Sequence, residues 1–392
     1  MSIENTPRPE GLDLSSWQEP ENLRWSFQHM DSLFPVRAIG ARGPAAELVT
    51  DPMDVHKLPV AMPGGVSSTV TDILDATDTD AWLLLHGNRI LAEEYRAGMS
   101  ASSPHLLMSV SKSLVSSVLS TLVDDGRVGL GQRIGEWIPA LRGSGYGDAT
   151  VRQVLDMRSG VRFSEDYLDP QSEVRGLDAA VGWAPPLPGG PGTLREFLAG
   201  LEADRPHGGY FQYRSCETDV LGWLCEAVSG RPFPELASEV LWSRVGSAHD
   251  AYITADAAGQ GMFDGGICAT LRDLACFGAM IRDGGRSLTG ERVLSEEWVQ
   301  DIFEGGEDAA EAFAAGPEGA SFPGGRYRSQ FWFPSERQDV ALCLGIHGQM
   351  VYIDRSAGLV GVKFSSTALP VDPGKGQSTV ALFEAIAREL DG

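Results

Sequence analysis

The sequence is poor in positive charge, and this scarcity excludes two classes of partner. Its 392 residues include 31 lysines and arginines against 54 aspartates and glutamates, which gives a formal net charge of −23. Such a surface repels the phosphates of nucleic acids and of anionic membranes, so neither is an expected partner. Hydrophobic residues make up 42% and charged residues 22% of the chain, as in an ordinary globular protein, so extensive disorder is also excluded.

Paired cysteines, metal-binding motifs and long apolar runs are missing as well. The five cysteines are odd in number and widely spaced, without a CxxC motif or a Cys/His pair at metal-ligand spacing. We therefore expect reduced thiols, no metal site and no cofactor. No 18 apolar residues run together, and residues 1–20 contain no apolar segment like that of a signal peptide, so the expected location is the cytoplasm.

Strand patterns lie toward the two ends of the chain, and helical patterns lie between them. Apolar runs on either side of Gly87-Asn88 predict a hairpin over 81–95, whereas residues 1–80 show weak periodicity and are expected to wrap over a core built elsewhere. The remaining predicted strands are 327–333, 339–346 and 359–365, the last two forming an antiparallel pair joined through 347–354. The predicted helices are 109–125, 151–157, 193–201, 217–228, 234–244 and 378–390.

This distribution predicts one discontinuous α/β domain interrupted by a helical insertion. The α/β domain would comprise residues 1–105 and 262–392, and the mainly helical domain residues 106–261. The length of the chain agrees with roughly two or three domains.

A Ser-x-x-Lys motif opens one of the predicted helices. Ser109 and Lys112 are three residues apart and share a helix face, so the lysine ammonium can reach the serine hydroxyl. The helix N-terminus adds positive potential and free N–H groups that favour an alkoxide or an oxyanion. A weak serine nucleophile requires such an environment. The spacing is also common by chance at helix starts, because serine is a preferred cap.

Two later motifs supply candidate partners for the serine. Tyr213 lies just before an apolar helix, where it is either a packing residue or a phenol beside Lys112. A neighbouring ammonium would lower the pKa of the tyrosine and allow it to exchange protons with Ser109 and the leaving group. His347, in the glycine-containing segment 345–349, either faces the cleft or ends a strand in a turn.

The serial order of these motifs resembles the serine β-lactamase and penicillin-binding-protein superfamily. The segment VRQVLDMRSG at 151–160 is similar to the RxLLxHTSG segment of the class C and family VIII esterase branch, and 265–275 also resembles that branch. A narrower resemblance, to the nylon-oligomer hydrolases, covers segments 16–20, 105–114, 165–170, 211–213 and 346–349. The resemblance implies a serine β-lactamase-like fold of class α/β plus α, with an antiparallel sheet flanked by helices, an inserted all-α domain and an active site between them.

The resemblance also implies an acyl-enzyme mechanism without a cofactor. Ser109 would attack a carbonyl carbon, while Lys112 and Tyr213 would accept its proton and pass one to the leaving group. The oxyanion would be held by the N–H of Ser109 and by one backbone N–H from residues 344–349.

Three further residues are expected at the substrate. By the resemblance, Tyr167 would close over it and hydrogen-bond the scissile amide nitrogen, unless it is only a loop aromatic packed on its own loop. Asp178 would attract a cationic amino end, or else is one acid of a solvated face. His347 stands where β-lactamases carry Lys-Thr-Gly, and a mostly neutral histidine binds a drug carboxylate poorly.

A second departure from the β-lactamase pattern is Ser215, which replaces the asparagine of the usual Tyr-x-Asn. The resemblance therefore implies a serine hydrolase of small linear amides, such as 6-aminohexanoate oligomers, and of short-chain esters. The alternatives are a carboxylesterase or acyltransferase with little amidase activity, a β-lactamase, and a binding protein without catalysis. The expected partner is a small-molecule amide or ester, and the resemblance also implies a homodimer.

Overall fold

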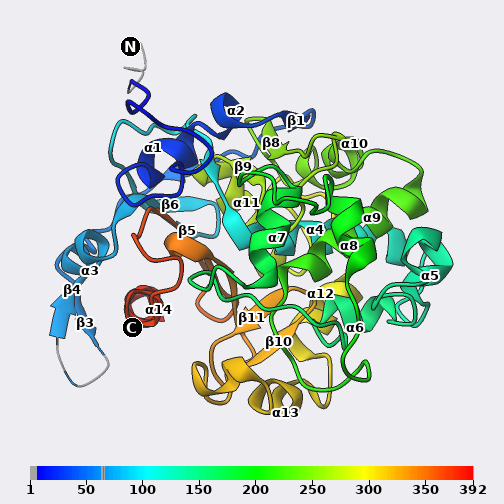
Figure 1. Cartoon of the computed structure of the whole chain (residues 1–392). Helices are drawn as coiled ribbons and strands as arrows, with labels where there is room; N and C mark the ends of the chain where they lie inside the picture. Colours follow the sequence, from blue (N-terminus) through cyan, green and yellow to red (C-terminus); the bar gives the residue numbers. More distant parts are fainter. Residues whose placement is uncertain (1–6, 63–64, 66, 392) are drawn as a thin grey trace.

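The computed structural model describes residues 7–62, 65 and 67–391 (Figure 1). An eight-stranded sheet forms its centre, in the order β10-β11-β12-β13-β14-β5-β6-β2. The strands of this sheet are β2 (Val49–Thr50), β5 (Thr79–His86), β6 (Arg89–Tyr95), β10 (Arg326–Arg328), β11 (Phe331–Phe333), β12 (Val340–Gly345), β13 (Gln349–Asp354) and β14 (Leu359–Ser365). All neighbouring pairs are antiparallel except β2 and β6.

Strands from the early and the late part of the sequence are neighbours in this sheet. The predicted hairpin forms as β5 and β6, joined through Gly87, whose φ of 60° suits a residue without a Cβ. β14 then pairs with β5 over Leu359 to Ser365, so a late strand and an early strand lie side by side. The antiparallel sheet expected from the sequence is therefore present.

Two strand predictions are wrong in detail. The strands predicted at 339–346 and 359–365 do not pair directly, because β13 lies between them and was interpreted as a connection. The strand predicted over 327–333 is split into β10 and β11. Ser329 and Gln330 have φ values of 50° and 68°, which a continuous strand does not allow.

A second sheet and the helices complete the fold. The four-stranded sheet has the order β1-β8-β9-β7, with β1 (Val36–Ile39), β7 (His105–Leu106), β8 (Ala251–Thr254) and β9 (Ile267–Ala269), and a separate pair joins β3 (Pro59–Ala61) to β4 (Ser67–Thr69). The α-helices are α1 (Leu23–Gln28), α2 (Met30–Leu33), α3 (Val70–Ala76), α4 (Ser111–Asp124), α5 (Ile134–Trp137), α6 (Val151–Leu155), α7 (Glu173–Ala180), α8 (Leu194–Gly200), α9 (Ser215–Ser229), α10 (Phe233–Ala237), α11 (Leu271–Arg282), α12 (Glu296–Glu304), α13 (Ala309–Ala314) and α14 (Pro373–Asp391).

The N-terminal segment is more ordered than its weak periodicity suggested. β1 pairs with β8, and the side chains of Trp17, Leu23 and Phe27 are buried in the main core. The described part of residues 1–80 thus contributes side chains to the core. None of the described helices is long and apolar enough to cross a bilayer.

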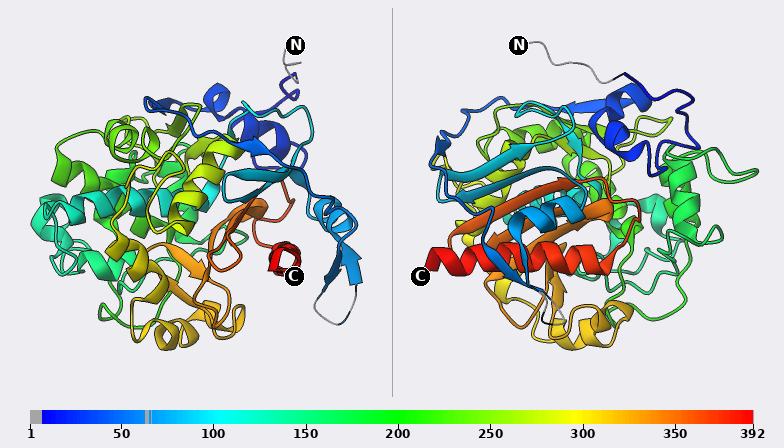
Figure 2. Two further views of the ribbon diagram at one scale, coloured as in Figure 1. Left: turned by 180° about the vertical axis from the view of Figure 1, so that it is seen from behind. Right: turned by 90° about the vertical axis from the view of Figure 1, so that its left-hand side faces the viewer.

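Helices cover both faces of the eight-stranded sheet. In the right-hand view of Figure 2, α14 in red and α3 in blue lie across one face. The other face packs on α11, and β12 and β13 contact residues 108–110 directly before α4, which in turn packs on α9. The five helical patterns predicted between the strands are observed as α4, α6, α8, α9 and α10, whereas α5 and α7 were not predicted. The exact division into domains at 105/106 and 261/262 stays a prediction.

Candidate active site

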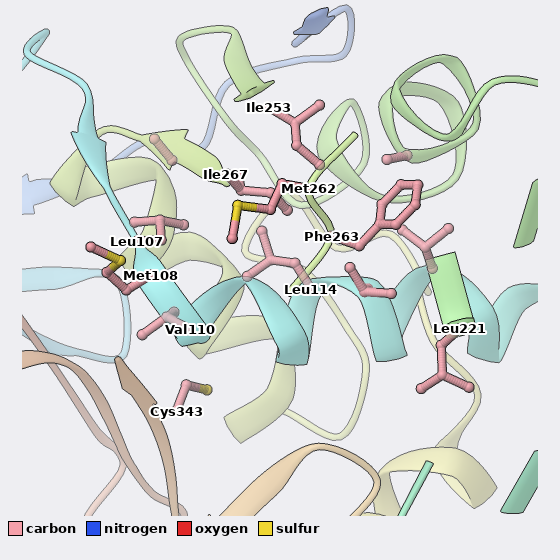
Figure 3. Close-up of a cluster of buried hydrophobic side chains, with 14 of the residues drawn as sticks. Leu107, Met108, Val110, Leu114, Leu221, Ile253, Met262, Phe263, Ile267 and Cys343 are labelled. Carbon is pink, nitrogen blue, oxygen red and sulfur yellow. The ribbon is translucent and has the colours of Figure 1, made fainter. Parts of the chain in front are cut away.

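Ser109 lies in a tight 3-10 turn, η1 (Met108–Val110), immediately before α4. The apolar side chains of the turn and of the residue before it, Leu107, Met108 and Val110, are buried and lie around the start of the helix (Figure 3). The end of β12 approaches closely, because a Cβ added at Gly345 would lie 2.6 Å from the Leu107 carbonyl oxygen. Local sequence thus fixes the serine on a rigid support beside a strand end.

Lys112 lies one helical turn further along and is 1% exposed. Its Nζ donates hydrogen bonds to Ser109 Oγ at 3.0 Å, to Ser215 Oγ at 3.0 Å and to the Asp264 carbonyl oxygen at 2.8 Å. All three ammonium hydrogens therefore have acceptors. The contact between Ser109 and Lys112 that the spacing predicts is present.

Lys112 keeps its positive charge in this environment. Burial lowers the pKa of the ammonium, but interaction with the acidic groups Tyr213, Asp264, Glu165 and Asp219 raises the pKa by a larger amount, so the net shift is upward. The lysine is an ammonium at neutral pH, and it must give up or share a proton before Ser109 can be deprotonated.

Tyr213 reaches the same place from the loop before α9. Lys112 Nζ lies 5.3 Å from the centre of its ring, and the ring packs against Trp332 with the centroids 5.2 Å apart. The expectation that the ammonium would lower the phenol pKa is wrong in its net direction. Burial raises the pKa of Tyr213 to about 12, and the opposing effects of Lys112 and of a hydrogen bond with Ser109 are smaller.

Glu165 is a residue of this site that sequence reasoning missed. One of its carboxylate oxygens accepts hydrogen bonds from the Tyr167 hydroxyl at 2.5 Å and from the Ser215 hydroxyl, and the other accepts from the Ser215 N–H at 2.6 Å. Glu165 therefore connects the loop that carries Tyr167 to the serine that contacts Lys112. No spacing rule relates position 165 to position 215, so the sequence held no signal for this contact.

A pair of buried acids lies behind Lys112. One carboxylate oxygen of Asp219 accepts from the backbone N–H groups of Phe263 and Asp264, at 3.0 and 3.1 Å. This fixes the loop whose Asp264 carbonyl holds Lys112. Gly222 allows the same loop to sit close, since a Cβ there would lie 2.1 Å from the Phe263 ring. Burial and the Asp264 charge raise the pKa of Asp219 well above its usual range.

Tyr167 lines the same cavity as Ser109, whereas Asp178 is connected to it indirectly. Arg175 donates to the Tyr167 carbonyl oxygen at 2.6 Å and lies 3.2 Å from an Asp178 carboxylate oxygen. Asp178 is 8% exposed, and burial raises its pKa to about 7. Its carboxylate is thus half neutral at pH 7 and already has a cationic neighbour.

The structure does not bring the His347 imidazole to the cavity. His347 has a φ of 62°, and its ring packs on Phe27 at 5.4 Å between centroids while Nδ1 lies 2.7 Å from the Thr367 carbonyl oxygen. Burial lowers the pKa of the ring to about 4, so it is neutral. Of the two possibilities for this residue, the geometry matches a turn at the end of β12.

A cavity of about 340 Å³ lies beside the candidate catalytic residues. Its lining includes Ser109, Glu165, Tyr167, Tyr213 and Ile346. Among the residues that the structure describes, no group of three or more His, Cys, Asp or Glu side chains is arranged to hold a metal ion. Such an arrangement could support a serine nucleophile with a lysine and a tyrosine as proton-exchange partners.

Comparison with known proteins decides the family. The family model described as Beta-lactamase matches residues 66–385. The chain belongs to the beta-lactamase family. This family comprises serine hydrolases, so the chain is a hydrolase with the serine β-lactamase fold that its motifs resemble.

Two relatives narrow the relationship within the beta-lactamase family. The chain is 40% identical over 356 residues to a 6-aminohexanoate-dimer hydrolase of Paenarthrobacter ureafaciens, covering 90% of this chain and 88% of that one. A solved structure from Bacillus anthracis, provisionally named 6-aminohexanoate-dimer hydrolase, has a TM-score of 0.89 and 26% identity and covers 98% of this chain and 99% of its own. These similarities confirm the resemblance found in the sequence.

A more distant neighbour shares only the fold. EstCE1, a hydrolase with promiscuous acyltransferase activity, has a TM-score of 0.62 and 14% identity over 81% of this chain and 98% of its own. A family VIII carboxylesterase is similarly related, with a TM-score of 0.60 and 16% identity over 81% of this chain and 96% of its own.

Proposed function

We propose that this protein hydrolyses small linear amides, such as 6-aminohexanoate oligomers, through an acyl-enzyme on Ser109. The observation that carries the proposal is the contact of Lys112 Nζ with Ser109 Oγ at 3.0 Å, beside a cavity that Ser109, Tyr167 and Tyr213 line. The 40% identity to a 6-aminohexanoate-dimer hydrolase supports the substrate class.

Acylation starts with attack of Ser109 Oγ on the amide carbonyl carbon. The proton of Ser109 passes to the pair formed by Tyr213 and Lys112. The pair can accept this proton only after one of its two members has lost its own. The resulting oxyanion rests on the N–H of Ser109 and, we suggest, on that of Ile346, which lines the cavity directly after β12. The neighbouring N–H of His347 is unavailable because it donates to the Pro370 carbonyl oxygen at 2.8 Å. Loss of one such donor typically costs about 3–4 kcal/mol in the transition state.

Collapse of the tetrahedral intermediate breaks the bond between carbon and nitrogen. The departing nitrogen receives a proton from the Tyr213 and Lys112 pair, while the Tyr167 hydroxyl hydrogen-bonds that nitrogen. Water, deprotonated by the same pair, then attacks the acyl carbon. The bond from that carbon to Ser109 Oγ breaks, the oxygen takes the proton back from the pair, and the acid is released. Ester cleavage needs no protonation of nitrogen, so Tyr167 matters more for amides than for esters.

Two features make efficient β-lactam hydrolysis an unfavoured activity. Ser215, in place of an amide side chain, is engaged by Lys112 and Glu165. His347 offers a neutral and buried ring instead of an ammonium. Neither residue supplies the contacts that the β-lactam side chain and carboxylate require.

The test is a paired assay on p-nitrophenyl acetate and on the linear 6-aminohexanoate dimer, with Ser109→Ala as the control. Turnover of both substrates, abolished in the variant, is the expected result. Turnover of the ester alone would contradict the amidase proposal and leave an esterase. Turnover of neither would remove the substrate class.

A carboxylesterase or acyltransferase is the second candidate, in view of the esterases and the acyltransferase that share the fold. Tyr167→Phe separates the candidates. An amidase loses amide turnover and keeps ester turnover in this variant, whereas an esterase keeps its activity. An acyltransferase would show slow hydrolysis and fast transfer to an added amine or alcohol.

The cellular location and the oligomeric state of the enzyme belong to the same proposal. We place it in the cytoplasm, in line with five buried cysteines that form no disulfide. A homodimer stays a prediction from the resemblance, to be measured by light scattering.

A further inference from the structure

The active-site cavity extends beyond the catalytic residues to the other side of the β12–β13 connection. The lining near Ser109 includes Tyr213 and Trp332, and the same cavity is lined by Lys363 and Val380. Lys363 lies on β14 between Val362 and Phe364, whose side chains belong to the main core, so its own side chain faces the sheet surface that α14 covers. The cavity thus passes around the end of the sheet and reaches a buried lysine.

Lys363 has no carboxylate partner among the described residues. It is 1% exposed, and its Nζ donates to the Thr77 carbonyl oxygen at 3.2 Å and to the Ser365 hydroxyl. The two acids that act electrostatically on Lys363 already have partners, Asp78 with Lys375 at 2.6 Å and Asp80 with Arg24 at 2.6 Å. A buried ammonium without a counterion is unfavourable, and an anion in the cavity would relieve that cost.

Two threonine hydroxyl groups of the cavity lining already donate to backbone carbonyl oxygens. The Thr77 hydroxyl donates to the Ile73 carbonyl oxygen at 2.7 Å, and the Thr379 hydroxyl donates to the Lys375 carbonyl oxygen at 3.0 Å. Lys363 uses two of its three hydrogens on acceptors of the described chain, so one hydrogen remains for a ligand.

We propose that Lys363 binds the free carboxylate of the substrate, at the end of the cavity away from Ser109. The inference rests on the proposed function, because the leaving half of a linear amino-acid oligomer ends in a carboxylate. The preferred substrates would then be linear amides whose leaving amine carries a carboxylate. The contact is an ion pair with a hydrogen bond, and no covalent bond forms there.

The test compares the linear dimer with its terminal carboxamide, which lacks the negative charge. The wild-type protein is expected to prefer the carboxylate by about ten- to a hundredfold in kcat/KM, the range of a hydrogen bond between charged groups. Lys363→Met, which keeps the apolar stem, is expected to abolish this preference by raising KM for the carboxylate alone. Lys57→Met removes the same charge from an exposed site and serves as the control.

An equal loss for both substrates in Lys363→Met, or an unchanged preference, would overturn the proposal. If that variant does not fold, the preference of the wild-type protein is measured between pH 6 and 8.5. Burial lowers the pKa of Lys363 to about 7, against the opposing effect of Asp80 and Asp78 and with Lys375 and Arg96 adding to the decrease. The preference should therefore fall as pH rises, and a preference that does not change with pH overturns the proposal.

A separate inhibition experiment distinguishes a failure of the carboxylate site from a failure of the proposed amidase function. If the protein cleaves only esters, the proposed amidase function fails, and Lys363 is tested by inhibition of p-nitrophenyl acetate turnover with 6-aminohexanoate. Weaker inhibition of Lys363→Met than of the wild-type protein would support the carboxylate site. Equal inhibition would overturn it.

Discussion

Glu165→Gln tests whether the Tyr167 loop is coupled to the catalytic lysine. The carboxylate accepts three hydrogen bonds, two of them from Ser215 and one from Tyr167. A glutamine has one acceptor oxygen, so its NH₂ group must face either the Ser215 N–H or the two hydroxyls. At least one hydrogen bond to a charged acceptor is lost, which costs about 1.5–3 kcal/mol. We expect amide kcat/KM to fall by about ten- to a hundredfold, at about 1.4 kcal/mol per factor of ten.

A change in the pH profile separates this positioning role from a loss of structure. Glu165 is one of the groups that raise the Lys112 pKa, and its negative charge disappears in the variant. The proton-accepting form of the lysine pair should then appear at lower pH, so the rise of kcat/KM with pH should shift toward acid. Ester turnover should fall less than amide turnover, because the Tyr167 contact serves the departing nitrogen.

The control is Asp166→Asn, which removes the same charge from an exposed position of the same loop. Its pH profile should match that of the wild-type protein. Wild-type amide turnover with an unshifted profile in Glu165→Gln would refute the coupling. A parallel loss of ester and amide turnover, with no shift in the profile, would leave Glu165 as a purely structural residue.

Three further predictions concern the proposed nucleophile, its proton-accepting pair and a buried ion pair next to Tyr213. Ser109→Ala should show no acyl adduct by intact mass after mixing with p-nitrophenyl acetate, whereas an adduct on the variant would place the nucleophile elsewhere. Because the net pKa shifts of Lys112 and Tyr213 are upward, their proton-accepting form grows with pH, and ester kcat/KM should rise through pH 7 to 9; a plateau below pH 7 would contradict this. Arg214→Met leaves Glu217 buried without its partner at 2.7 Å, so denaturant unfolding should report a loss of about 3–5 kcal/mol at pH 8, and a smaller loss at pH 5, where the carboxyl can take up a proton.

Local patterns predicted the parts of the molecule that depend on short stretches of chain. The hairpin of β5 and β6 follows from apolar runs around a Gly-Asn turn, and the contact of Lys112 with Ser109 follows from helical spacing. β13 was not predicted, because the segments that form β12 and β14 were expected to pair directly with each other. Only Met350 to Ile353 of this six-residue strand are apolar, and so short a run does not itself indicate which strand it pairs with.

The remaining misses depend on burial and on contacts between distant segments. The direction of the Tyr213 pKa shift could not be inferred, because the desolvation that decides it comes from Trp332 and its neighbours, far away in the sequence. His347 turned away from the cavity because its positive φ redirects the side chain, and a histidine gives little indication of that conformation. Glu165 depended on a contact across 50 residues.

The position of Glu165 bears on how the same three catalytic residues can serve different substrates. The proposed mechanism needs only Ser109, Lys112 and Tyr213 for acyl transfer, and a carboxylesterase and a hydrolase with acyltransferase activity share the fold of this chain. An amide differs from an ester in the proton that its leaving nitrogen needs. In this chain the hydroxyl proposed to contact that nitrogen, on Tyr167, is tied by one carboxylate to the serine that holds Lys112. We therefore expect a substitution in this loop to change amide turnover through Lys112 without altering the nucleophile, and we propose that the loop, more than the Ser-Lys-Tyr set, decides the preference for amides.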